Sequence, residues 1–101
     1  MRTLVMFDLP TLTSAERRQY RQFRKKLIKE GFVMLQFSIY TKLTLNSTQK
    51  TRVERFVEVN KPPAGDLAML TITERQFANM KHLLGSHHVN VLQTTERLVV
   101  R

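Results

Sequence analysis

The fold is decided by residues 1–31, MRTLVMFDLPTLTSAERRQYRQFRKKLIKEG, which contain one complete strand and one complete helix in succession. The first nine residues contain the apolar run Leu4-Val5-Met6-Phe7, which Asp8 cuts short, and this predicts a buried β-strand. Thr13 and Glu16 have the spacing of a capping box, which marks the start of a helix, and Gly31 marks its end. We therefore expect a strand followed directly by a helix over about residues 14–30.

The rest of the chain continues to alternate extended and helical patterns. Residues 32–43 alternate with a period of two, which fits either one long bent strand or two short ones. Beyond them the sequence predicts a helix capped by Asn46 and Gln49, a strand over 66–73, a short helix from Thr73 to Gly85 that Thr73 and Gln76 cap, and two extended segments near 88–93 and 97–101. This order predicts an α+β fold of the ferredoxin-like β-α-β-β-α-β type, with an added short helix and a C-terminal strand.

In such a fold both main helices cover one face of an antiparallel sheet, and helical spacing identifies the side chains that face the core. These are Tyr20, Phe23, Leu27 and Ile28 in the first helix, Val53, Phe56 and Val57 in the second, and Phe77, Met80 and Leu84 in the short third one. Phe7, Phe37 and Tyr40 lie in predicted strands, so we interpret them as packing residues and not as base-stacking ones. The other sheet face needs a cover, which in a small protein is often a second copy of the chain.

Length and composition limit the classes of function. A chain of 101 residues fits a single domain over 1–101, and the absence of cysteine excludes a disulfide scaffold, a thiolate zinc site and a cysteine nucleophile. Seventeen basic residues against eight acidic ones give a net charge of +9, which favours nucleic acid over an anionic membrane as the partner. No apolar run reaches the roughly 18–20 residues of a membrane span. We expect a cytoplasmic nucleic-acid-binding protein with no membrane partner and no small-molecule substrate.

The predicted first helix carries seven positive charges and no acidic residue between positions 17 and 29. Arg18, Arg21, Lys25 and Lys29 fall together opposite the apolar stripe, Arg17 and Arg24 flank that stripe, and Lys26 lies on the far side. An ordinary solvated helix face usually interleaves glutamates, because i,i+4 pairs of opposite charge stabilise a helix. The pattern therefore favours contact with a phosphate backbone over mere solubility, and it carries no information about base sequence.

Asp8 ends the first apolar strand, where a carboxylate needs water, a hydrogen-bond donor or a metal ion. A hard cation such as magnesium often takes one or two carboxylates plus waters. The residues alone favour a simpler role, in which Asp8 accepts hydrogen bonds within the Asp8-Leu9-Pro10 turn. The sequence shows no serine–histidine–aspartate set, glycine-rich phosphate loop or paired-carboxylate motif that would indicate another reaction.

In combination these features resemble the Cas-two family, the small dimeric subunits of CRISPR adaptation complexes. The resemblance rests on the apolar strand ending Phe7-Asp8-Leu9-Pro10, on the arginine-rich helix, and on Gln36-Phe37-Ser38-Ile39-Tyr40 after Gly31, and it covers essentially the whole chain. The helix expected at 74–85 and the ending Glu96-Arg97-Leu98-Val99-Val100 look most like members from systems with a single-protein effector nuclease.

The resemblance implies a homodimer with a core of about residues 1–85, in which the C-terminal segment, about 86–101, pairs with the sheet of the partner protomer. It also implies that the dimer bridges two dimers of the Cas-one integrase and holds a double-stranded prespacer on its basic surface. Asp8 matches the family's metal aspartate, so two copies could share one magnesium ion that supports cleavage of RNA or DNA.

Three functions are therefore open. The first is a DNA-binding scaffold in spacer acquisition, with Arg17, Arg18, Arg21, Arg24, Lys25 and Lys29 on the nucleic acid. The second is a free-standing magnesium-dependent endonuclease, acting on RNA or DNA through Asp8. The third is a basic protein–protein module with no nucleic-acid role.

Overall fold

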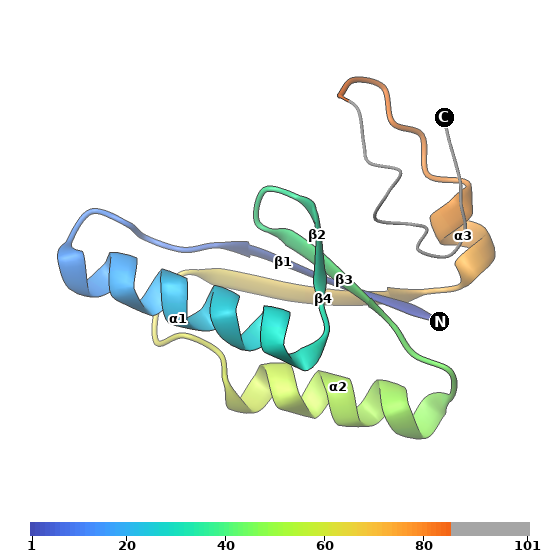
Figure 1. The fold of residues 1–101 in the computed structure, drawn as a ribbon, viewed down its shortest axis with the longest axis horizontal. Coiled ribbons are helices and arrows are strands. Elements are labelled where there is room, and N and C mark those ends of the chain that lie inside the picture. The colour runs from blue at the N-terminus through green and yellow to red at the C-terminus, as the bar shows by residue number, and fades with distance from the viewer. Residues whose placement is uncertain (86–101) are drawn as a thin grey trace.

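The computed structural model describes residues 1–85, which form four strands and three helices (Figure 1). In chain order these are β1 (Arg2–Asp8), α1 (Ser14–Glu30), β2 (Val33–Gln36), β3 (Ile39–Leu43), α2 (Ser47–Val59), β4 (Asp66–Ile72) and α3 (Glu74–Ala78). The extended segments predicted near 88–93 and 97–101, and with them the pairing segment at 86–101, lie outside the described residues. Within residues 1–85, no helix is long and apolar enough to cross a membrane.

The four strands form one antiparallel sheet in the order β2-β3-β1-β4. α1 connects β1 to β2, which lie on either side of β3, and α2 connects β3 to β4, which lie on either side of β1. Both helices lie on the same side of the sheet (Figure 1). This is the split β-α-β arrangement of the ferredoxin-like fold, so the predicted fold class is confirmed.

The ends of the two main helices follow from local sequence. The Thr13 hydroxyl accepts a hydrogen bond from the Glu16 N–H at 3.1 Å, and the Glu16 carboxylate accepts one from the Thr13 N–H at 3.0 Å. Gly31 ends α1 in the left-handed conformation, with φ 110°, which glycine adopts without strain. The Asn46 side chain caps α2 by accepting a hydrogen bond from the Gln49 N–H at 2.9 Å.

The core lies between the sheet and the two main helices. Its buried side chains are Val5, Phe7, Leu9, Phe23, Leu27, Phe32, Tyr40, Val53 and Val57. Phe7 stacks on Tyr40 with 5.7 Å between ring centroids and meets the Phe23 ring edge-on at 5.3 Å. Ring pairs of this geometry add about 0.5–1.5 kcal/mol to their burial, so Phe7 fixes β1 against both α1 and β3.

The predicted core positions of α1 and α2 are confirmed for Phe23, Leu27, Val53 and Val57. Two more predicted members, Tyr20 and Phe56, are partly buried and pack against this core. The prediction for Ile28 is wrong, because this side chain is 46% exposed. Successive helical residues are about 100° apart around the axis. Phe23 and Leu27 lie at the centre of the apolar stripe, and Ile28 lies at its edge.

Residues 32–43 form two short strands and not one long bent strand. The chain turns at Phe37 and Ser38, where Ser38 has a φ of 66°, and the register of β2 against β3 shifts between Met34 and Gln36. The turn breaks the period of two, so Phe37 is 78% exposed and its interpretation as a packing residue is wrong. The same interpretation is confirmed for Phe7 and Tyr40, which are buried.

The third helix is shorter than predicted, because α3 ends at Ala78 and not near Gly85. Its start is as expected, since Thr73 and Gln76 form a capping box and Phe77 is buried. After the helix, the Met80 N–H donates a hydrogen bond to the carbonyl oxygen of Phe77, and this i→i−3 bond forms a tighter turn than the α-helix. Leu84 is 91% exposed, so it adds no packed contact that would extend the helix beyond Ala78.

Gly65, in the connection between α2 and β4, approaches the end of β1 closely. It has a φ of 102°, and a Cβ added there would lie 2.8 Å from the backbone oxygen of Asp8 and 2.8 Å from Leu9 Cδ2. We expect Gly65→Ala to lower the free energy of unfolding by about 1–3 kcal/mol, the cost of a left-handed non-glycine residue, with steric conflict in addition. Urea denaturation followed by circular dichroism measures the change.

The neighbouring Ala64→Ser variant is the control, because Ala64 is exposed and its substitution should change stability by less than about 0.5 kcal/mol. An unfolding midpoint for Gly65→Ala equal to that of the wild type would contradict the close approach of Gly65 to β1.

Candidate functional site

Four cationic side chains of α1 form a row along its solvent side, and we call them the outer row: Arg18, Arg21, Lys25 and Lys29. All four are exposed, as the helical spacing predicts. None has a hydrogen bond or ion pair with another residue of the part that the structure describes, residues 1–85. From Arg18 to Lys29 the row rises by eleven residue steps, or about 16 Å along the α-helix. Its four charges are therefore available to an anionic partner.

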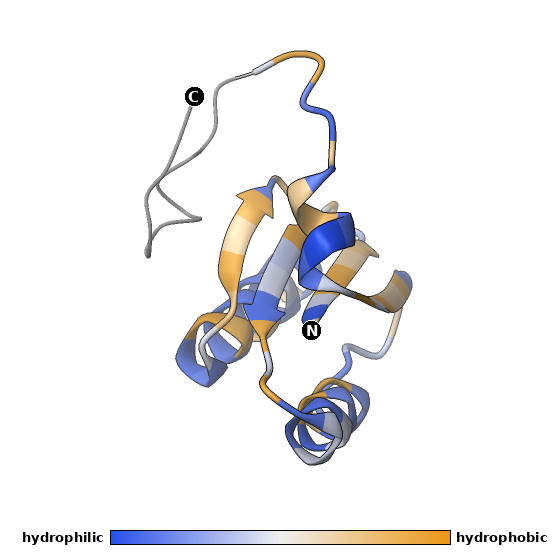
Figure 2. Cartoon of the chain, turned by 90° about the vertical axis from the view of Figure 1, so that its right-hand side faces the viewer, coloured by the Kyte–Doolittle hydropathy of each residue, from blue (hydrophilic) through white to orange (hydrophobic). Residues whose placement is uncertain are grey.

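The carboxylates of α1 do not neutralise the outer row. Glu16 is at the first turn, where its oxygen accepts from the backbone N–H groups of Leu12 and Thr13. Glu30 is at the last turn and pairs with Arg52 of α2 at 2.8 Å. Both acids thus have partners at the helix ends, and the middle of the helix keeps its positive charge. Figure 2 shows that α1 and α2 are predominantly hydrophilic, whereas the sheet carries much of the hydrophobic colouring.

Arg17 and Arg24, the two predicted flanking residues, are held by other parts of the protein. Arg17 Nη1 donates to the backbone oxygens of Thr11 and Leu12 at 3.1 and 3.0 Å, which steadies the loop before α1. Arg24 Nε donates to the hydroxyl of Tyr40 at 2.8 Å, which joins α1 to β3. Both residues remain exposed. Their anchoring separates them from the outer row, whose side chains are free to adjust to a ligand.

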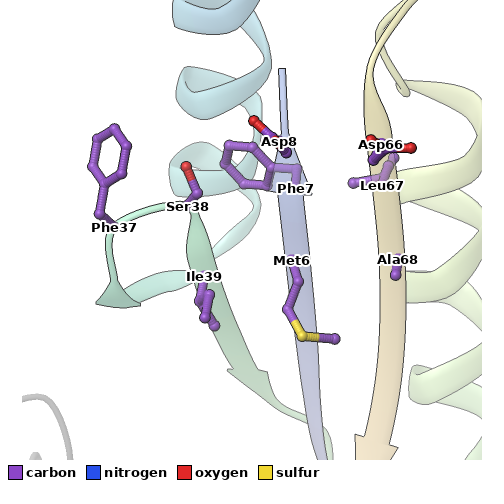
Figure 3. A pocket seen from close by; sticks show the side chains of 9 residues that line it. All are labelled: Met6, Phe7, Asp8, Phe37, Ser38, Ile39, Asp66, Leu67 and Ala68. Carbon is purple, nitrogen blue, oxygen red and sulfur yellow. The ribbon is translucent and has the colours of Figure 1, made fainter. Parts of the chain in front are cut away.

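Asp8 lies at the rim of an open hollow of about 550 Å³ on the sheet, which we call the Asp8 hollow. Its lining residues are Met6, Phe7, Asp8, Phe37, Ser38, Ile39, Asp66, Leu67 and Ala68 (Figure 3). The Asp8 side chain is exposed, and the pairing of β1 with β4 places Asp66 directly opposite it. Residues opposite each other in an antiparallel pair point to the same face, so two carboxylates occupy one end of the hollow.

Asp66 is not among the site residues that the sequence predicts, although the sequence contains a signal for it. The strand predicted at 66–73 begins at Asp66 and the first strand ends near Asp8, so antiparallel pairing of these two strands brings both acids together. Phe37, predicted as a packing residue, instead has an exposed ring at the rim of the same hollow (Figure 3).

The oxygen donors at this end of the hollow fit a hard cation such as magnesium, which often binds through one or two carboxylates and keeps several waters. Among residues 1–85, no group of three or more histidine, cysteine, aspartate or glutamate side chains is placed to hold a metal ion. A cation at Asp8 would therefore take its remaining ligands from water, from a phosphate or from a second copy of the chain.

Comparison with known proteins shows the family. The family model described as "CRISPR associated protein Cas2" matches residues 1–80. The chain is 48% identical over 100 residues to the CRISPR-associated endoribonuclease Cas2 of Treponema denticola, with 99% of each chain covered. It is 46% identical over 99 residues to the protein of the same name from Streptococcus mutans serotype c, covering 98% of this chain and 91% of that one.

The fold has a counterpart among solved structures. The crystal structure of Streptococcus pyogenes Cas2 at pH 6.5 matches with a TM-score of 0.61, over 82% of this chain and 99% of that chain. The two sequences are 17% identical, so this likeness concerns the fold alone. The family match and the two curated relatives carry the assignment, and on them the chain belongs to the Cas2 family of CRISPR-associated proteins.

Proposed function

We propose that this protein is a homodimeric, duplex-binding scaffold of CRISPR spacer acquisition. The outer row of α1 carries the proposal, because it presents four cations with no protein partner within residues 1–85. Such a row suits the evenly spaced charges of a nucleic-acid backbone and reads no base sequence. In this role the dimer holds the prespacer duplex and bridges two dimers of the Cas-one integrase, which performs the strand transfer. Arg17 and Arg24 lie beside the row as secondary contacts.

The measurement that tests the scaffold is the affinity for duplex DNA over a range of salt concentrations, for the wild type and for a variant with the outer row reversed. Each phosphate that the protein neutralises contributes a slope of about 0.9 in log affinity against log salt. Capture of an integrase partner by a protein that binds no duplex at any salt concentration would instead favour the protein–protein module.

The dimer is supported by the sheet face that α1 and α2 leave uncovered, which we call the open face. Its apolar side chains, identified by their pairing across the strands, are Leu4, Met6, Val33, Ile39, Leu43, Ala68, Leu70 and Ile72, of which Leu4 is already buried. Leu43 is 47% exposed and Leu70 is 53% exposed. Burying apolar surface of this kind lowers its free energy by about 25 cal/mol for each Å² removed from water. A second copy that stacks its own open face here would bury both sheets.

Placing a charge on the open face should dissociate the dimer. We expect Leu70→Lys to be monomeric at protein concentrations where the wild type is dimeric, because stacking the faces would bury the new ammonium group without a partner. Sedimentation equilibrium measures the difference. Leu12→Lys is the control, since Leu12 is 89% exposed in the loop before α1 and its charge would stay in water. A dimer dissociation constant for Leu70→Lys equal to that of the wild type would exclude the open face as the interface.

The alternative function is a magnesium-dependent endonuclease acting through Asp8. Two observations support it: Asp8 and Asp66 are opposite each other in the Asp8 hollow, and both curated relatives carry the name endoribonuclease. When bound, a magnesium ion would polarise a phosphodiester and activate a water molecule. Asp8 would hold the ion from the end of β1, and Asp66 would supply a second oxygen donor beside it. The outer row on α1 and Asp8 at the end of β1 are different surfaces, so duplex binding and cleavage can be tested by separate substitutions.

A further inference from the structure

A small notch lies on the inner flank of α1, where the connection from α2 to β4 passes beside the helix (Figure 1). It has a volume of about 110 Å³, and its lining residues are Gln19, Gln22, Phe23, Lys26, Asn60, Lys61, Pro62 and Pro63. Two features outside the outer row meet here. Lys26 is the basic residue of α1 on the far side of the helix, and Lys61-Pro62-Pro63 is the clearest loop of the sequence.

The notch combines two positive charges with amide groups and contains no acid. Gln19, Gln22 and Lys26 are three and four residues apart, so they lie on one strip of the helix. Within residues 1–85, neither Lys26 nor Lys61 has a hydrogen bond or an ion pair with another side chain, and the same holds for both glutamines. Two unpaired cations beside free amide donors form a site that an anion would complete.

The walls of the notch are fixed by the fold. Phe23, 2% exposed, belongs to the core and forms its base. Asn60 ends α2, and its Nδ2 donates to the Phe56 oxygen at 2.8 Å, which fixes the side nearest α2. Pro62 and Pro63 restrict the backbone of the connecting loop. When a ligand binds, the two lysine side chains are therefore the main groups that lose conformational freedom, which keeps the entropic cost of binding small.

We propose that this notch binds one phosphate of the nucleic-acid backbone, held between Lys26 and Lys61 with hydrogen bonds from Gln19 and Gln22. The inference rests on the proposed duplex-binding function and adds a contact outside the outer row. A notch of about 110 Å³ lined by two lysines and two glutamine amides has room for one phosphate group. Lys26 is one helical turn from Lys29, so the notch continues the outer row toward α2.

A carboxylate of a protein partner is the competing occupant, because it would also pair with two lysines. Two observations favour the phosphate. The notch adjoins four further cations that are unpaired among the described residues, and the chain as a whole carries a net charge of +9. A nucleic-acid strand can follow such a continuous positive path from one side of α1 to the other, whereas a single acidic side chain uses only the notch.

The test is a double variant, Lys26→Gln with Lys61→Gln, measured for binding to a blunt DNA duplex between 0.05 and 0.3 M salt. These conditions bracket roughly 0.1 M, where each lost phosphate contact lowers affinity about eight-fold. For each notch that contacts the duplex, we expect the double variant to lose about eight-fold in affinity, and the slope of log affinity against log salt to fall by about 0.9. Lys26→Arg should keep most of the affinity, because it keeps the charge. The Gln19 and Gln22 side-chain amide signals should shift on addition of duplex in the wild type only.

The matched control is Arg75→Gln with Lys81→Gln, which removes two exposed charges from α3 and the segment after it. It should leave the slope unchanged. Equal slopes for the notch variant and the control, while reversal of the outer row abolishes binding, would overturn the notch and leave the scaffold standing. Loss of integrase capture with unchanged duplex binding would also overturn it, in favour of a protein carboxylate. Failure of the wild type to bind duplex would instead reject the proposed function itself.

Discussion

Arg18→Glu, Arg21→Glu and Lys25→Glu together are expected to weaken duplex binding at least about 100-fold at 0.1 M salt. The three side chains are exposed and have no hydrogen bond or ion pair with another of the described residues. Each phosphate contact is worth about eight-fold at this salt concentration, so three lost contacts would account for about 500-fold, and the new negative charges add repulsion. The slope of log affinity against log salt should fall by about 0.9 for each contact. Fluorescence anisotropy with a labelled duplex measures both quantities.

The same substitutions should leave the fold intact, which makes the loss interpretable. The three new carboxylates repel one another at i,i+3 and i,i+4 spacing as the cations did, but position 21 gains an opposite charge at Arg17 and position 25 gains one at Lys29, which offsets this repulsion. The matched control reverses three exposed basic residues elsewhere, Arg55, Arg75 and Lys81, with the same change in net charge. The control should retain most of the affinity. Equal losses in the two triple variants would mean that overall charge, and not the outer row, determines binding.

The parts of the structure that the sequence predicts well are those set by neighbouring residues. The side chains of Thr13 and Glu16 each accept a hydrogen bond from the backbone N–H of the other residue, so the start of α1 needs no tertiary contact. Gly31 likewise ends the helix through its own backbone conformation. Helical spacing then determines which side of α1 is apolar and which is basic, so the outer row could be placed from the sequence alone.

The parts that the sequence does not predict depend on contacts between distant segments. Asp8 and Asp66 meet only because β1 pairs with β4 in one particular register. A shift of that register by one residue would place Asp66 on the opposite face. The notch has the same origin, because Lys26 and Lys61 come together only when α2 returns the chain beside α1. The prediction for Phe37 is wrong because a tight turn, and not a continuous strand, follows Gln36.

Asp8→Asn has the second large expected effect, a decrease of at least about 100-fold in magnesium-dependent cleavage of single-stranded RNA or duplex DNA. Asparagine keeps the size of the side chain and removes its charge, and loss of a group that supports a metal ion commonly costs 10- to 100-fold or more. Asp8 is exposed at the end of β1, so the substitution should leave stability and duplex binding unchanged. Cleavage of end-labelled substrates, resolved on gels over a range of pH, measures the rate.

Binding of the metal can be separated from cleavage by thermal unfolding, since a ligand that binds only the folded state raises its stability. Magnesium should raise the unfolding temperature of the wild type and of the remote control Glu58→Gln, but not that of Asp8→Asn. Glu58 is an exposed carboxylate of α2, so its removal matches the change in charge without touching the Asp8 hollow. Cleavage and magnesium-dependent stabilisation that both survive in Asp8→Asn would place the metal elsewhere. A wild type that cuts neither substrate would reject the enzyme and leave α1 as the functional surface.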